Sequence, residues 1–318
     1  MKRSPVRSTH RLTFGPESKV LSTAVPTVLV IGNLDGVHLG HQALLRQARS
    51  LATQHGLPVT ALTFDPHPSL VLRGSAPPRL TTIERRVELL RRHGADDVVV
   101  EHFTPALATL TPREWDAQLL GTRGARAVVV GKNFFYGAKR AGNLETMREH
   151  GKELGFEVAV ADFVGDEGGP FSSTRVRDAI ARGDLDESAR LLGRRHSLSG
   201  IIEHGDHRGR TIGFPTANVS GASEILPPFG VYAVFADDRP AVMNLGVRPT
   251  VDGHSLRIEV HLFDFEGDLY GTSMSVHFVK RIRDEQRFDG LDALKAQIAI
   301  DAAAARVVLA ALRPGDGE

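Results

Sequence analysis

The segment VIGNLDGVHLGH, residues 30–41, places glycines, an acid and two histidines at the point where an apolar run ends. His38 and His41 are three residues apart, so their rings would share one face of a helix that begins here. Imidazole N–H groups donate hydrogen bonds to phosphate oxygens, and the start of a helix favours an anion. The pattern therefore predicts a phosphate site. Surface histidines that cap a loop are one alternative, and a metal site is another, although this stretch offers no obvious further ligands.

The glycines of the same segment predict a backbone that comes close to a ligand. An open parallel sheet binds ligands beyond the carboxyl ends of its strands, and this segment follows a predicted strand. The candidates for phosphate contacts are Gly32, Asn33, Asp35, Gly36 and Gly40. The dinucleotide pattern GxGxxG and the Walker pattern GxxxxGKS/T do not occur in the chain.

Composition narrows the class of protein. The 318 residues carry a formal net charge of only +1, which gives no support for a nucleic-acid or membrane partner. The lack of cysteines excludes disulfides, thiolate catalysis and cysteine-based zinc sites, and fits a reducing, cytoplasmic environment. The basic residues 1–15 lack the apolar core of a signal peptide, and no apolar run reaches the length of a membrane span.

The first half of the chain alternates short apolar runs with longer amphipathic segments. Strands are predicted at 25–32, 57–65, 96–103, 125–131 and 156–164, and helices at 41–56, 82–94, 114–124, 145–155 and 173–193. Strands joined by crossover helices form a parallel sheet. The sequence therefore predicts an α/β, Rossmann-like domain over residues 1–193.

The pattern of predicted strands and helices changes after about residue 197. Short β-rich segments follow one another without a helix between them, which favours an antiparallel β-barrel. An amphipathic segment at 290–312 predicts a C-terminal helix. The second domain is therefore expected over residues 194–318.

The HxGH pattern resembles the signature of the nucleotidyltransferase superfamily. TFDPHP (63–68), VVVGKNFFYGAKRAGN (128–143) and FSSTRVRDAIARGDLDESARLLGR (171–194) resemble blocks of the prokaryotic FAD synthetase family. The resemblance implies that His38 and His41 stabilise charge growing on the phosphates of ATP, which the glycine-rich loop binds. It also implies that Asn133 holds ATP and that Phe64 and Asp65 face the flavin acceptor.

The SSTxxR pattern at 172–177 is expected to close this site. Ser172, Ser173 and Thr174 stand at a predicted helix start, where hydroxyls and free N–H groups can hold polyphosphate. Arg177 is placed to pair with the leaving pyrophosphate. A plain helix N-cap is the alternative interpretation of the same residues.

The second half resembles the riboflavin kinase module in the order and spacing of its motifs. The resemblance rests mainly on GDHRGRTIGFPTANV (205–219) and IEVHLFDFEGDLYG (258–271). It implies that Thr216 and Asn218 hold the magnesium ion that bridges the ATP phosphates. Hard oxygen ligands of this kind suit Mg²⁺.

The same resemblance makes Glu259 the general base for the kinase reaction. Strand alternation leaves open an interpretation in which the side chain of Glu259 only points outward, between Ile258 and Val260. The remaining candidates for ATP binding in the kinase are Gly209, Arg210, Gly213 and Pro215. The first two would form a flexible flap over ATP, with a plain hairpin turn as the alternative.

Several positions depart from the family patterns. Leu34 stands where phenylalanine is usual, Lys132 replaces an acid, and Phe135 replaces a polar or basic residue. Arg195 and His196 replace a proline–tyrosine pair between the domains. None of these positions is a residue assigned chemistry above.

The combined resemblance implies a bifunctional riboflavin kinase/FMN adenylyltransferase. Riboflavin would be phosphorylated by ATP to FMN, and FMN would be adenylylated to FAD with release of pyrophosphate. The expected partners are small molecules and Mg²⁺, with no nucleic acid and no membrane, in a monomer or weak homo-oligomer. The alternatives are a paralogue for a modified flavin or with one active module, an HxGH enzyme for another phosphorylated acceptor, and a non-catalytic flavin-binding protein.

Overall fold

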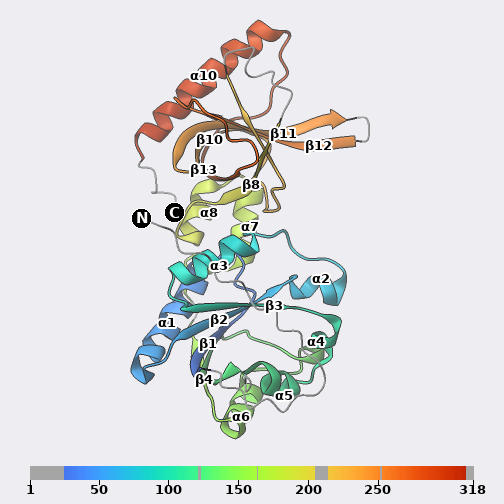
Figure 1. The fold of residues 1–318 in the computed structure, drawn as a ribbon, viewed down its shortest axis with the longest axis vertical. Helices are drawn as coiled ribbons and strands as arrows, with labels where there is room; N and C mark the ends of the chain where they lie inside the picture. The colour runs from blue at the N-terminus through green and yellow to red at the C-terminus, as the bar shows by residue number, and fades with distance from the viewer. Residues whose placement is uncertain (1–24, 121–122, 163, 205–213, 251–252, 313–318) are drawn as a thin grey trace.

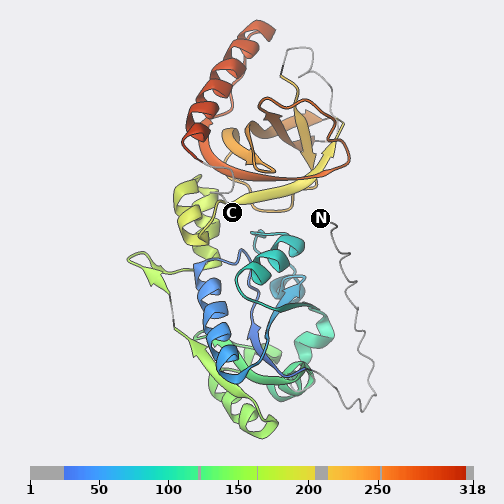
Figure 2. The same ribbon diagram turned by 60° about the vertical axis from the view of Figure 1, so that its left-hand side comes forward.

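Two modules follow one another along the chain. The computed structural model describes residues 25–120, 123–162, 164–204, 214–250 and 253–312. Figures 1 and 2 show an α/β module, then helices α7 (Ser173–Ala181) and α8 (Leu185–Leu192), then a β-barrel. The predicted domain boundary at residues 193 and 194 falls at the C-cap of α8.

The N-terminal module is built on a parallel sheet with the strand order β3-β2-β1-β4-β5. The strands are β1 (Thr27–Ile31), β2 (Val59–Asp65), β3 (Asp97–His102), β4 (Ala125–Gly131) and β5 (Glu157–Ala161). Every residue of the central strand β1 is buried, as an apolar run covered on both faces should be. The predicted α/β fold is confirmed, and the segment with the two histidines follows the carboxyl end of the central strand.

The longer helices of this module occupy predicted helical segments. They are α1 (Leu39–His55), α3 (Ile83–Arg92) and α6 (Leu144–Leu154). Both α1 and α6 end at a glycine in the left-handed conformation, which lacks the steric penalty of a side chain. The shorter elements are α2 (Pro68–Arg73), α4 (Pro105–Thr109), α5 (Pro112–Trp115), a 3-10 helix (Ala138–Arg140), β6 (Gly165–Asp166) and β7 (Gly169–Pro170).

Two predicted helices were wrong in their extent. The segment 114–124 is α5 followed by a π-helix at Asp116–Leu120. The segment 173–193 is divided into α7 and α8, because Gly183 adopts a φ of 77° and the Asp184 side chain caps a new helix. A glycine and an aspartate at such a junction are helix-end and helix-start signals.

The C-terminal module is a closed antiparallel barrel with the strand order β10-β11-β12-β9-β8-β13. Its strands are β8 (Ser197–Glu203), β9 (Ala217–Ser220), β10 (Gly230–Ala236), β11 (Arg239–Thr250), β12 (Gly253–Leu262) and β13 (Ser273–Arg283). Ile258 and Val260 of β12 belong to the buried core of the barrel. The residue between them, Glu259, therefore points to the outer face.

Helix α10 (Leu291–Ala310) covers another part of the outer barrel surface. Arg283 at the end of β13 donates from Nε and Nη2 to the Asp301 carboxylate at 3.0 Å and 2.8 Å. The pair is largely buried, so it clamps the helix to the barrel. In the part of the chain that the structure describes, no helix is both long and apolar enough to cross a membrane.

Replacing Asp301 tests this clamp. Asp301→Asn should lower the free energy of unfolding by about 3–5 kcal/mol, because Arg283 would stay buried without a counter-charge. The exposed pair of Arg306 with Asp264 is the matched control, and Asp264→Asn should cost no more than about 1 kcal/mol. Urea denaturation gives both values, and equal losses for the two variants would contradict the clamp.

Candidate active sites

His38 and His41 meet at the amino end of α1. Their ring centroids are 3.7 Å apart with 24° between the planes, so the rings are stacked. Nδ1 of His38 accepts a hydrogen bond from the Gly40 N–H at 3.1 Å and so caps the helix. A neutral imidazole that accepts at Nδ1 carries its proton on Nε2, which leaves Nε2–H of His38 as a donor. Capping and phosphate binding are therefore compatible roles for His38.

Both rings are held in the neutral form. Burial, reinforced by the positive charge of Arg194, lowers the pKa of His38 to about 4. Burial and the neighbouring His38 ring lower the pKa of His41 well below 6.5. Nδ1 of His41 is buried and has no hydrogen-bond partner within the described chain. Such a pair suits hydrogen bonding to a ligand rather than fixed positive charge. No group of three potential metal-ligating side chains was found among the described residues.

Two glycines of this loop are required by the protein's own packing. Gly36 has a φ of +83°, and a Cβ there would lie 2.7 Å from Cδ1 of Leu80. A Cβ on Gly40 would lie 3.0 Å from Phe171 O. The close approach expected of these glycines is thus made to protein atoms. Contacts of Gly32, Gly36 and Gly40 with phosphate stay predictions.

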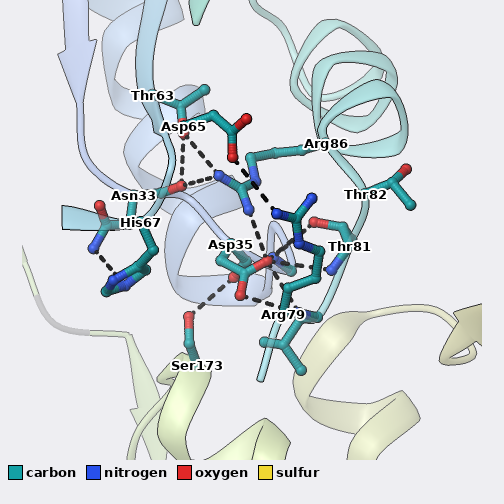
Figure 3. A network of polar contacts seen from close by, with 12 residues as sticks. Asn33, Asp35, Thr63, Asp65, His67, Arg79, Thr81, Thr82, Arg86 and Ser173 are labelled. Carbon is teal, nitrogen blue, oxygen red and sulfur yellow. Dashed lines mark hydrogen bonds and ion pairs between the residues drawn. The ribbon is translucent and has the colours of Figure 1, made fainter. Parts of the chain in front are cut away.

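Asp35 is at the centre of the polar network drawn in Figure 3. Its carboxylate is 3% exposed and accepts hydrogen bonds from the N–H groups of Leu80 at 3.0 Å and Thr81 at 3.2 Å. It also pairs with Arg86 at 3.0 Å and with Arg177 at 2.6 Å. The structure surrounds this anion with protein donors, so its observed contacts organise the loop. The expected contact of Asp35 with ATP stays a prediction.

Arg86 and His67 are parts of this network that the sequence analysis did not name. Nη1 of Arg86 donates to Asn33 O at 3.1 Å, and burial lowers the pKa of this arginine. Nε2 of His67 lies 3.1 Å from Nδ2 of Asn33. The TFDPHP motif already held the signal for His67. No signal marks Arg86, because it is one of several arginines in an amphipathic helix.

The SST segment lies against the histidine loop. Ser172 caps α7 by accepting a hydrogen bond from the Arg175 N–H at 3.3 Å. The Ser173 hydroxyl donates to Asp35 O at 2.9 Å, and Thr174 is exposed. The N-cap interpretation therefore describes Ser172. Ser173 connects the SSTxxR segment to the loop that precedes the two histidines.

Phe64 and Asp65 end strand β2 and differ in their environment. Phe64 is only 7% exposed, and its ring packs edge-to-face on Phe103 at 5.7 Å within the core. The expected flavin contact of this ring does not fit its buried position. Asp65 is partly exposed and lies 3.6 Å from Arg79, so it stays a candidate for the acceptor side.

The turn after β4 carries Asn133, which is exposed. Lys132 pairs with Asp162 at 2.9 Å, and the Arg140 guanidinium lies 4.9 Å from the centre of the exposed Phe135 ring. A cavity of about 560 Å³ opens beside this turn. Its lining includes Lys132, Phe134, Phe135, Asn143, Arg148 and Lys152. The same cavity is also lined by Glu145 and Glu149, so the departures from the family pattern at Lys132 and Phe135 lie on an accessible surface with aromatic rings and charges of both signs.

Glu259 belongs to a polar row on the outer face of the barrel. It lies opposite Asn244 of β11 and opposite Asn218 of β9, and Asn218 in turn lies opposite Glu203 of β8. Side chains of residues directly opposite each other in antiparallel strands share one face. Glu259 also forms an ion pair with Arg257. The outward orientation of Glu259 is thus observed, and it places the carboxylate on the same face as Asn218.

A second cavity, of about 300 Å³, lies beside Thr216. Its walls include Pro215, Thr216, Val260, Leu262, Phe265, Leu269 and Tyr270. Pro215 O lies 2.8 Å from Nδ1 of His261, which fixes the segment that leads into β9. The predicted flap residues Gly209 and Arg210, and Gly213 of the same motif, lie outside the described residues.

The neutral state of the histidine pair can be measured. Ring ¹⁵N spectra should show His38 neutral through the physiological range and titrating near pH 4. Histidines of the urea-unfolded chain should titrate near 6.5. Between pH 6.5 and pH 4 the histidine would bind a proton in the unfolded chain but not in the native protein. The free energy of unfolding should therefore fall as the pH drops from about 6.5 to about 4. A His38 ring that is protonated at pH 6 would contradict the proposed environment.

Known proteins match both modules. Residues 21–175 match the family model of FAD synthetase, and residues 192–309 match that of riboflavin kinase. The bifunctional riboflavin kinase/FMN adenylyltransferase of Escherichia coli K12 is 39% identical over 316 residues, which cover 97% of this chain and 99% of the relative. The protein of the same name from Bacillus subtilis is 35% identical over 298 residues, which cover 90% and 93%.

A solved structure shares the whole arrangement. The crystal structure described as a macrolide-efflux protein from Streptococcus pneumoniae is 33% identical, with a TM-score of 0.81, and the match covers 90% of this chain and 95% of that one. The two family models match the two modules in their order along the chain. The chain belongs to the bifunctional riboflavin kinase/FMN adenylyltransferase family.

Proposed function

We propose that this bifunctional riboflavin kinase and FMN adenylyltransferase carries out its two reactions at the two constellations described above. FMN forms at the outer face of the barrel, around Asn218 and Glu259. FAD forms at the loop that holds His38 and His41. The observation that carries the FAD assignment is the stacked and neutral histidine pair at the amino end of α1, of which His38 is buried.

In the N-terminal module, a phosphate oxygen of FMN attacks the α-phosphorus of ATP. The bond from that phosphorus to the bridging oxygen breaks, and pyrophosphate leaves with the electron pair. Nε2–H of His38 donates to an oxygen on which negative charge grows, and His41 supplies the stacked partner with an unsatisfied ring nitrogen. Because both rings are neutral, they act as hydrogen-bonding groups, and no covalent enzyme intermediate is needed.

Arg177 is held beside the histidine loop by its contacts with Asp35 and Pro78, and we assign it to the same reaction. Its Nε donates to Pro78 O at 2.6 Å, and its Nη2 donates to Asp35 at 2.6 Å. A guanidinium has five N–H donors, so these two contacts leave donors for the leaving pyrophosphate. The hydrogen bond from Ser173 to Asp35 O connects α7 to the histidine loop, so Arg177 and the histidines keep a fixed position relative to each other.

In the barrel, Glu259 removes the proton from the ribityl 5′-hydroxyl of riboflavin while that oxygen attacks the γ-phosphorus of ATP. The bond from that phosphorus to the β,γ-bridging oxygen breaks, and ADP leaves with the electron pair. The ion pair with Arg257 holds the carboxylate in place. Asn218 lies opposite Glu259, and Thr216 precedes Asn218 by two residues. Their side-chain oxygens are hard ligands of the kind that fits Mg²⁺. When bound there, Mg²⁺ would offset charge on the ATP phosphates.

The cavity beside Thr216 fits the nucleotide of the kinase reaction. Its apolar and aromatic walls, including Leu262, Phe265 and Tyr270, suit a flat base, and Thr216 stands where the phosphates would approach the metal ligands. We therefore assign this cavity to the base of ATP.

Product analysis separates this proposal from its alternatives. Pure protein with riboflavin, ATP and Mg²⁺ should yield FMN and then FAD on chromatography. FMN without FAD, or FAD only from supplied FMN, would indicate one active module. Neither product would favour another acceptor, a modified flavin or a binding protein. A monomer or weak homo-oligomer stays a prediction for sedimentation analysis.

Removing the His41 ring tests the adenylyltransferase assignment. His41→Ala should lower the rate of FAD formation from FMN by about 10²–10³, because a hydrogen-bonding group at the growing charge is lost. FMN formation from riboflavin in the same sample should be unchanged. His55 is exposed at the other end of α1, so His55→Ala is the matched control and should leave both rates intact. Equal FAD formation by the two variants would refute the assignment.

The kinase assignment is tested in the reverse direction. Glu259→Gln should lower FMN formation by about 10²–10⁴, the usual contribution of a general base, while FAD formation from supplied FMN persists. Asp238 lies in the exposed turn between β10 and β11, so Asp238→Asn is a matched loss of one carboxylate outside the site. A kinase rate of Glu259→Gln equal to that of Asp238→Asn would exclude Glu259 as the base.

A further inference from the structure

Arg194 connects the two modules through a buried guanidinium. The residue belongs to the segment that leads from α8 into the barrel, and it is 8% exposed. Its Nη2 donates to Gly36 O at 2.8 Å, and its Nη1 lies 3.4 Å from Val37 O and 3.4 Å from Leu192 O. One side chain next to the barrel thus binds the two peptide carbonyls that directly precede His38.

The loop that Arg194 contacts has an unfavourable backbone. Leu34, Gly36 and Val37 have φ values of 51°, 83° and 40°. Glycine adopts such a conformation freely, but a β-branched residue such as Val37 rarely does. A strained segment of this kind persists only where its surroundings hold it. The residue after Val37 is the helix-capping His38, so the strain is stored immediately before the candidate catalytic pair.

Three side chains contact the peptide groups of Gly36 and Val37. Besides Arg194, Nε2 of Gln42 donates to Val37 O at 3.0 Å and to Leu192 O at 2.9 Å. The Gly36 N–H lies 3.4 Å from Oγ1 of Thr81. Gln42 and Thr81 come from the N-terminal module. Arg194 is the member of the set that comes from the segment joining it to the barrel.

The barrel fixes the chain just beyond Arg194. Nε2 of His196 lies 2.8 Å from Ile225 O, and the His196 ring stacks on Phe278 of β13. The Ile225 N–H donates to Arg79 O at 2.8 Å, beside the residues that bind Asp35. The barrel therefore holds the backbone next to Arg194. Because the guanidinium of Arg194 binds the histidine loop, the position of that loop depends on the position of the barrel.

The acceptors of Arg194 are unusual for a buried cation. Those that the structure shows are backbone carbonyls, and burial lowers the pKa of this arginine to about 9, so it is still charged at neutral pH. A charged guanidinium forms stronger hydrogen bonds to carbonyls than a neutral donor does. It can also bridge several acceptors with its planar fork, which a lysine cannot.

We propose that Arg194 is a positioning residue for adenylyl transfer, which holds the strained 34–37 loop so that His38 and His41 meet the ATP phosphates. The proposal rests on the assignment of that histidine pair to FAD formation. It makes the segment next to the kinase barrel a structural part of the adenylyltransferase site.

Kinetics of FAD formation from FMN test the proposal. Arg194→Lys keeps the charge but loses the planar guanidinium that bridges several carbonyls. The kcat of this variant should fall about tenfold or more, with little change in the KM for ATP. FMN formation by the same preparation should be unchanged, which shows that the chain is folded. Arg182 is exposed at the end of α7, so Arg182→Lys is the matched control and should keep both rates.

Chemical rescue provides a second readout that a general loss of stability would not give. Arg194→Ala should lose FAD formation, and guanidinium ions below the denaturing range should restore part of it, because they can refill the vacated site. A kcat in Arg194→Lys equal to that of the wild type would overturn the proposal. So would a loss of both activities in Arg194→Ala without rescue. A wild-type protein that makes no FAD from FMN would instead refute the proposed function itself.

Discussion

A buried carboxylate in contact with two arginines determines how the N-terminal site is built. Asp35 is placed by the turn after β1, and its partners come from residues 80 and 81, from α3 and from α7. A charge withdrawn from water is tolerated only with such partners, so each of them contributes to keeping the carboxylate buried. The histidine loop, α3 and α7 are therefore fixed together, and the donors of the SSTxxR segment cannot shift independently of His38.

Burial is the main reason why the rings of the histidine pair are neutral, and the charges around the pair add to it. Arg86, Arg177 and Arg194 all act to lower the pKa of His41, while Asp35 is the carboxylate at the centre of the network. A histidine that took up a proton here would add to an existing excess of positive charge. Neutral rings can still donate hydrogen bonds without increasing that repulsion. The three arginines outnumber the one carboxylate, so the net positive charge of this region would attract an anion such as a triphosphate.

Most of the fold could be predicted because its signals are local. The β4 strand was predicted with its observed bounds, since a β-branched apolar run between a glycine and a polar turn has few alternatives. The predicted helix at 173–193 was wrong in its extent because two adjacent residues interrupt a periodic segment. Gly183 and Asp184 divide one amphipathic pattern into two helices, and the hydrophobic spacing on either side is too similar to reveal the break. Short helices such as α2 have less than two turns of periodicity to read.

The two sites differed in how much of them could be predicted, for a physical reason. The outward orientation of the polar row with Glu259 could be predicted from strand alternation, because a shift of the strand by one residue would turn Glu259 into the apolar interior. Once Ile258 and Val260 are recognised as core, the face of Glu259 is determined. The adenylyltransferase site depends on contacts between residues far apart in the sequence, such as Arg194 with Gly36. Arginines of this kind are indistinguishable in sequence from the solvated arginines beside them, so only the tertiary fold reveals that a side chain near the barrel restrains the loop of the other module.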